Sequence, residues 1–78
     1  MKMETKVNLE YVRDIGSTKA ILYCYYKEHP LLMIKQLAYD LGLSERSVHN
    51  ILDDLETRGY VKRVARNVSA SEKYTFLK

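Results

Sequence analysis

A chain of 78 residues with 46% hydrophobic residues and a formal net charge of +3 is long enough for one globular domain. A domain of this length buries only about 60 to 65% of the surface that its unfolded chain exposes, so its core is small. No segment reaches the roughly 18 apolar residues of a membrane span, and residues 1–6 lack the apolar stretch of a secretory signal. We therefore expect no membrane partner and an intracellular, cytoplasmic location.

Residues 1–16 are expected to be an N-terminal extension, followed by one domain over residues 17–78. The apolar residues that alternate as in a strand are Val7, Leu9 and Tyr11. Those that fit one side of a short helix are Leu9, Val12 and Ile15. We favour the helix, because Asn8 stands where an N-cap would be, and we consider it a candidate dimerisation helix.

A second helix is expected from Thr18 to about Glu28, after Gly16 breaks the first pattern and Ser17 caps the new one. Pro30 ends this helix, and a short extended strand follows it at residues 31–33. The residues expected to face inward are Ile21, Leu22 and Tyr25, with Cys24 on the flank. As the single cysteine, Cys24 is expected to be a small buried hydrophobe, and an intersubunit or redox cysteine is the alternative.

Tyrosines on the second helix indicate a partner surface. Tyr23 and Tyr26 are expected on the outer side of a helix whose inner side is already apolar. Exposed aromatic area of this kind is best explained by a contact between subunits. We therefore expect a homodimer whose interface includes Tyr11, Ile15, Tyr23 and Tyr26.

Two short amphipathic helices, Ile34 to Leu41 and Ser44 to Arg58, follow each other directly. Their apolar stripes are Ile34, Leu37, Ala38 and Leu41, then Val48, Ile51, Leu52 and Leu55. Gly42 provides the positive φ that ends the first helix, and the Ser44 side chain caps the second. This succession is the sequence form of a helix-turn-helix.

A β-hairpin is predicted after the second of these helices, which ends near Arg58 and Gly59. Residues 60–66 and 72–77 are rich in β-branched and aromatic residues, and the small polar run 67–71 separates them. Tyr74 and Phe76 share one face and are expected to pack on the helices. The fold class is therefore α+β, mostly helical, with a three-helix core and a C-terminal hairpin.

The C-terminal segment is the basic part of the chain. Residues 57–78 contain six Lys or Arg and one Glu, a balance of +5, whereas residues 1–56 contain seven Lys or Arg and nine Asp or Glu, a balance of −2. A localised basic pole suits contact with a polyanion such as nucleic acid. A solvated hairpin with surplus lysine gives the same pattern, so charge alone leaves both interpretations open.

The residue pattern resembles the winged helix-turn-helix transcription regulators, with the closest likeness to the MarR, TrmB and ArsR-like branches. The segments that carry this resemblance are Leu37-Ala38, Leu41-Gly42-Leu43-Ser44, and Glu56-Thr57-Arg58-Gly59-Tyr60-Val61. The resemblance covers about residues 17–77. It implies that the second helix of the motif enters the major groove of double-stranded DNA, while the hairpin tip, or wing, lies on the DNA backbone or in the adjacent minor groove.

Candidate DNA contacts follow from this resemblance together with helix geometry. A rotation of 100° per residue turns Arg46 and Asn50 away from the core, and these side chains pair well with guanine and adenine. The expected contacts of the helix are Ser44, Glu45, Arg46, Ser47, His49 and Asn50. The expected contacts of the wing are Arg63, Arg66, Ser69, Ser71 and Lys73. Carboxylates at Asp53, Asp54 and Glu56 would repel phosphates, so we expect the N-terminal half of the helix to dock.

Other function classes fit the sequence less well. Two isolated histidines, one cysteine and no phosphate-binding loop give no catalytic constellation, no metal site and no cofactor or small-molecule site. The main alternative is a winged helix used for protein contact, but that interpretation expects an apolar or acidic face where Arg46 and Asn50 stand. RNA is less favoured because a rigid helix does not fit the narrow groove of A-form RNA. The simplest mechanism is repression by operator occlusion, with activation as the alternative.

Overall fold

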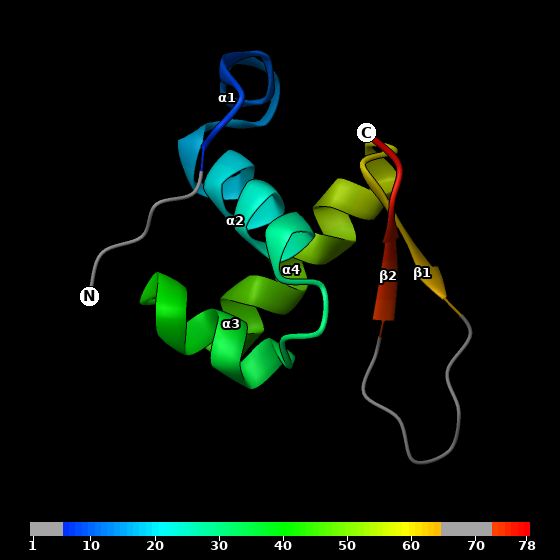
Figure 1. The fold of residues 1–78 in the computed structure, drawn as a ribbon. Helices are drawn as coiled ribbons and strands as arrows, with labels where there is room; N and C mark the ends of the chain where they lie inside the picture. The colour runs from blue at the N-terminus through cyan, green and yellow to red at the C-terminus, as the bar shows by residue number, and fades with distance from the viewer. Residues whose placement is uncertain (1–5, 65–72) are drawn as a thin grey trace. The chain divides into compact units, whose positions relative to one another are not determined.

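The computed structural model describes residues 6–64 and 73–78, and these form four helices and one two-stranded antiparallel sheet (Figure 1). In chain order the elements are α1 (Leu9–Ile15), α2 (Ser17–Glu28), α3 (Ile34–Leu41), α4 (Glu45–Thr57), β1 (Val61–Val64) and β2 (Lys73–Phe76). The chain divides into two compact units, Met1–Leu32 and Met33–Lys78. The first contains α1 and α2, and the second contains α3, α4 and the hairpin.

The first unit begins with the short helix that we preferred over a strand. Asn8 is the N-cap of α1, and its Oδ1 accepts a hydrogen bond from the Glu10 backbone N–H at 2.8 Å. Gly16, with φ 90°, is the only residue between α1 and α2. Its carbonyl accepts from the Ala20 N–H at 3.0 Å, so Gly16 and not Ser17 is the N-cap of α2. The predicted Ser17 cap is wrong, because Ser17 is already the first residue of the helix.

The buried face of α2 differs from the predicted one. Tyr23 and Tyr26 are only 1% and 2% exposed, whereas Ile21 and Tyr25 are half-buried. α1 packs against α2, and the Tyr11 ring meets the Tyr23 ring edge-on, with centroids 5.4 Å apart. The buried residues on α2 are Ala20, Leu22, Tyr23, Cys24 and Tyr26, which confirms the buried position of Cys24.

This burial corrects the proposed dimer interface. Ile15, Tyr23 and Tyr26 are buried within the chain, and Tyr11 is half-buried. The prediction that Tyr23 and Tyr26 lie on the outer side of α2 is therefore wrong. The physical reason is that the run from Ala20 to Tyr26 is apolar on every side of the helix, and that α1 covers one of those sides.

The segment between α2 and α3 is a turn and not the expected short strand. α2 ends at Glu28, as predicted, and the Leu32 backbone N–H donates to the His29 carbonyl at 3.1 Å. Met33 has extended backbone angles and is the N-cap of α3. Residues 31–33 have no strand partner, and the described sheet consists of β1 and β2.

The second unit is built on the two apolar stripes that the sequence predicts. α3 packs against α4, and α4 packs against β1. The central buried side chains are Leu37, Val48, Leu52, Leu55 and Val61. Ala38 is buried as well. Ile51 and Leu41, which were expected in the same stripes, are half-buried.

The hairpin strands pair in the antiparallel sense, with Val61 opposite Phe76 and Arg63 opposite Tyr74 (Figure 1). On β2, Tyr74 is buried and Phe76 is half-buried, while Thr75 between them is exposed. This alternation confirms the predicted inner face of the second strand. The predicted hairpin tip, residues 67–71, lies outside the described residues.

Candidate nucleic-acid interface

The turn between α3 and α4 fixes where α4 begins. The Leu43 N–H donates to the Ala38 carbonyl at 2.9 Å, and the Gly42 N–H donates to the Tyr39 carbonyl at 3.2 Å. These two bonds form a Schellman motif, which requires a left-handed residue at Gly42, where φ is 70°. Because glycine adopts this conformation without steric cost, α3 ends there and the chain turns directly into α4.

The same device ends α4 and starts the hairpin. The Tyr60 N–H donates to the Leu55 carbonyl at 2.9 Å, and the Gly59 N–H donates to the Glu56 carbonyl at 3.1 Å. Gly59 has φ 83°. Local backbone hydrogen bonds therefore fix the turns on both sides of α4. The turn at Gly59 sets the direction of β1 relative to α4.

Ser44 caps α4, as the sequence predicts. Its Oγ accepts from the Ser47 backbone N–H at 3.1 Å and donates to the Ser47 Oγ at 3.0 Å. Both hydroxyls therefore contribute to the helix start before any ligand is bound. Glu45 lies in the first turn of α4, where a carboxylate is favoured by the helix dipole.

Replacing Ser44 by alanine is expected to lower the free energy of unfolding by about 1 kcal/mol, because the Ser47 N–H loses its side-chain acceptor. Urea unfolding followed by circular dichroism measures the change. Ser17→Ala is the matched control, since Ser17 is an exposed residue at the start of α2 but is not its N-cap. Equal losses for the two variants would contradict the capping role of Ser44.

The polar face of α4 is open, as the sequence predicts. Glu45, Arg46 and Asn50 are exposed, and Ser47 and His49 are half-buried. Arg46, Asn50 and Asp53 follow one another at intervals of four and three residues, so they lie on one side of the helix. We refer to Arg46, Asn50 and Asp53 as the reading face. A guanidinium and a carboxamide on an exposed helix are the two groups best suited to bidentate hydrogen bonds with purines.

The carboxylates near the C-terminal end of α4 have partners in the chain. Asp54 Oδ2 lies 2.8 Å from Arg58 Nε, and Asp53 Oδ1 lies 2.9 Å from Arg63 Nη2. Glu56 Oε2 accepts a hydrogen bond from the Arg63 backbone N–H at 3.3 Å. The two arginines offset much of the negative charge that, from sequence, was expected to keep this half of the helix away from phosphates.

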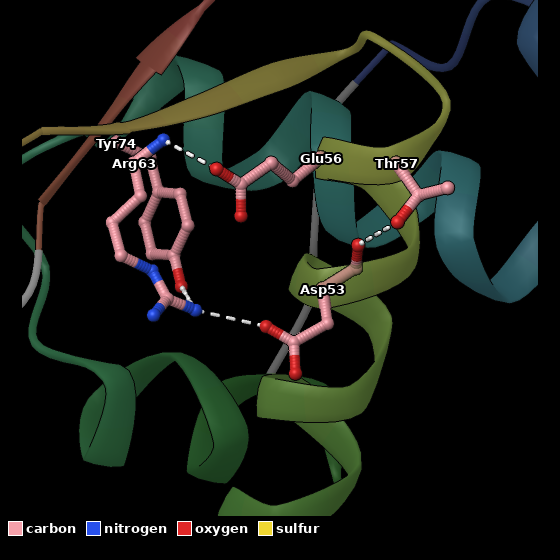
Figure 2. A network of polar contacts seen from close by, with 5 residues as sticks. All are labelled: Asp53, Glu56, Thr57, Arg63 and Tyr74. Carbon is pink, nitrogen blue, oxygen red and sulfur yellow. Dashed lines mark hydrogen bonds and ion pairs between the residues drawn. The ribbon is translucent and has the colours of Figure 1, made fainter.

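Figure 2 shows that Arg63 reaches from β1 toward α4 with Tyr74 of β2 beside it. The Arg63 Nη2 group also lies 3.4 Å from the Tyr74 hydroxyl, and the guanidinium carbon is 5.8 Å from the centre of the Tyr74 ring. One arginine therefore contacts both hairpin strands and the reading face. Sequence reasoning missed this pairing, since Asp53 and Arg63 are ten residues apart and belong to different elements.

The structure describes only some of the predicted wing contacts. Arg66, Ser69 and Ser71 lie outside the described residues. Lys73 is the first residue of β2, and its side chain also lies outside the described part of the chain. Arg63 is exposed enough to meet a ligand, but the structure shows it paired with Asp53. The predicted contacts on α4, by contrast, are brought together on one short helix.

Other kinds of site receive no support in residues 6–64 and 73–78. In that part of the chain no three His, Cys, Asp or Glu side chains are grouped so that they could hold a metal ion. No helix there is long and apolar enough to cross a membrane.

Comparison with known families assigns α3 and α4 to a family. The family model of the IclR helix-turn-helix domain matches residues 21–65, which is more than half of the chain. The chain belongs to the IclR helix-turn-helix domain family. No curated protein and no solved structure matches the chain.

Membership in the IclR-type family, together with the four helices and the antiparallel hairpin, confirms an α+β winged helix-turn-helix. The domain is therefore a DNA-binding domain of a transcription regulator. The narrower resemblance to the MarR, TrmB and ArsR-like branches is replaced by the IclR-type assignment. The match includes α3, α4 and β1, so it contains the whole reading face and Arg63.

Proposed function

We propose that the chain recognises a specific sequence of double-stranded DNA by inserting α4 into the major groove. The observation that carries this proposal is the exposed reading face, which starts two residues after a well-formed N-cap, in the first turn of α4 of an IclR-type domain. Arg46 would bind a guanine through its O6 and N7 atoms, and Asn50 would bind an adenine through its N6 and N7 atoms. Ser44, Glu45, Ser47 and His49 would lie along the edges of the same groove.

The wing would add contacts to the DNA backbone. Phosphate contacts from Arg66, Ser69, Ser71 and Lys73 fix orientation without reading sequence. The basic balance of residues 57–78 supports this assignment, because a surplus of cations in that segment attracts the phosphates of DNA. We assign no catalytic role and no cofactor to the chain.

We further propose that the regulator acts as a repressor by occlusion. A protein bound to an operator prevents polymerase or another factor from occupying the same duplex, and this mechanism requires nothing beyond tight sequence-specific binding. The polar character of Arg46 and Asn50 favours this function over a winged helix used only for protein contact, which would present an apolar or acidic surface there.

Selection of binding sites from random duplex DNA, followed by footprinting, tests sequence recognition. The expected result is an enriched site with a purine-rich core that is protected in its major groove. A second arm places the selected site downstream of a promoter in an in vitro transcription reaction. Repression by occlusion predicts less transcript as protein is added. Failure to enrich any sequence would contradict DNA recognition, and increased transcript would contradict repression while leaving recognition intact.

A homodimer remains part of the proposal, with a different surface from the tyrosines first considered. Among the described residues of the first unit, 6–32, the exposed large apolar side chains are Leu9 and Leu31. Two copies related by a twofold axis would present two reading helices about 34 Å apart, which corresponds to half-sites one helical turn apart. The N-terminal segment 1–16 retains its proposed role as the dimerisation extension.

Sedimentation velocity at micromolar concentration tests the dimer directly. The expected species has twice the 9.2 kDa mass of the chain. Leu9→Asp is expected to shift the population toward the monomer, whereas Tyr39→Asp, a charge placed on the exposed side of α3, serves as the control. A monomer at all concentrations, or an enriched site without half-site symmetry, would contradict the dimer.

A further inference from the structure

We propose that Asp53 and Arg63 form a positioning pair that holds the hairpin strands at a set orientation to the reading face, and that Arg63 is not itself a phosphate contact. This inference rests on the proposed DNA recognition by α4. It assigns Asp53, a carboxylate at first expected only to oppose docking, a favourable role in DNA binding.

The ion pair between Asp53 and Arg63 joins α4 to both strands of the hairpin. Asp53 ends the reading face, three residues after Asn50, and its Oδ1 atom is 2.9 Å from Arg63 Nη2 (Figure 2). Arg63 belongs to β1 and stands directly opposite Tyr74 of β2 in the antiparallel register. Because the same Nη2 atom also lies 3.4 Å from the Tyr74 hydroxyl, the guanidinium connects both strands to the reading face.

A second contact fixes the backbone of β1 at the same residue. The Arg63 N–H donates to Glu56 Oε2 at 3.3 Å, and Glu56 lies three residues after Asp53 on α4. The carboxylates of Asp53 and Glu56 therefore bind the side chain and the main chain of one residue. Two bonds at different atoms of Arg63 restrict the rotation of β1 relative to α4. A single ion pair would still allow this rotation.

Electrostatics supports a positioning role over a phosphate contact. Arg63 and Asp53 are 39% and 62% exposed, so the pair is close to the surface that DNA would approach. For Arg63 to bind a phosphate, it would have to leave Asp53 and expose an uncompensated carboxylate beside the DNA backbone. Keeping the pair intact neutralises Asp53 and leaves the strands in place.

The two roles predict opposite effects of removing the Asp53 charge. If Arg63 bound phosphate, Asp53→Asn would strengthen DNA binding, because a repulsive carboxylate is lost and the arginine is released. If the pair positions the hairpin, Asp53→Asn weakens binding by about fivefold, the factor that corresponds to the upper end of energies measured for exposed ion pairs.

The experiment measures dissociation constants on the selected duplex for Asp53→Asn, Arg63→Met and the double variant. Arg63→Met is expected to weaken binding at least as much as Asp53→Asn, because Arg63 also contacts Tyr74. The double variant is expected to match Arg63→Met, since Asp53 acts through Arg63. Exchange of the two charges, Asp53→Arg with Arg63→Asp, is expected to recover most of the lost affinity.

Asp54→Asn is the matched control. Asp54 is the neighbouring residue on α4 and its carboxylate pairs with Arg58, which lies outside the hairpin strands. Asp54→Asn removes the same charge as Asp53→Asn without releasing β1, so the DNA affinity of this variant should equal or exceed that of the wild type.

Hydroxyl-radical footprinting separates positioning from a general loss of fold. Asp53→Asn should lose protection of the flanking backbone while the major-groove contacts remain.

The outcomes distinguish the two proposals. Wild-type protein that selects no duplex contradicts the proposed function. Asp53→Asn binding that equals or exceeds the wild type, an additive double variant, or an Asp53→Asn footprint with full flanking protection contradicts the positioning pair alone. Circular dichroism of each variant confirms that the helices are retained.

Discussion

Replacement of Leu52 by alanine is expected to lower the free energy of unfolding by about 2 to 5 kcal/mol, the range typical of truncating a fully buried leucine. Leu52 is on the buried side of α4 and is 0% exposed. Removing one methine and two methyl carbons leaves a cavity next to the helix that carries the reading face. A domain of this size has a total stability of only about 4 to 12 kcal/mol, so the loss is large.

Urea or thermal unfolding measures this effect, and Leu77→Ala provides the matched control. Leu77 is 53% exposed, so the same truncation there removes far less buried area. The melting temperature of the Leu52 variant should fall by about 10 °C or more, at about 4 to 8 °C for each kcal/mol in a domain of this size. Equal effects of the two substitutions would show that α4 is not packed as the structure describes.

The helix-turn-helix could be predicted closely because its signals are local. Gly42 and Gly59 each occupy the left-handed position of a Schellman motif, and Ser44 bonds a backbone group three residues away. None of these features depends on residues distant in the sequence. The bounds of α3, and the start of α4 after Ser44, therefore agree with the expected ones.

The orientation of α2 could not be predicted in the same way. Seven consecutive apolar residues from Ala20 to Tyr26 leave no polar side from which the buried side can be identified. The deciding contact is the edge-on pair of Tyr11 and Tyr23, which requires the position of α1. Among the described residues, the strongly exposed tyrosine is Tyr39, on α3.

The link between Asp53 and Arg63 also depends on tertiary structure. From sequence, Arg63 is one of several basic residues of the hairpin, and Asp53 is one of several carboxylates of α4. Only the direction of β1 after Gly59 brings the two side chains together. Sequence reasoning therefore treated them as independent charges and assigned Arg63 to DNA and Asp53 to repulsion.

Arg46→Ala is expected to weaken binding to the selected site by about 1 to 3 kcal/mol and to relax the sequence preference at one position. Arg46 is exposed in the first turn of α4, where the helix would enter the groove deepest. A guanidinium that binds a guanine through two hydrogen bonds distinguishes guanine from the other bases, and alanine does not. The measurement compares dissociation constants on the selected duplex and on duplexes that carry each substitution of the guanine.

Two further variants separate base reading from charge. Lys73→Ala should weaken binding to all sequences alike and lower the salt slope by about one, as expected for a phosphate contact. Arg13→Ala removes the same charge as Arg46→Ala, but from α1, and should leave the base preference unchanged. If Arg46→Ala weakened all duplexes equally, Arg46 would be a phosphate contact and the guanine reading would be wrong. If Arg46→Ala retained full affinity and preference, the N-terminal end of α4 would not enter the groove. Any base contact made by that end of the helix would place Arg46 in the interface.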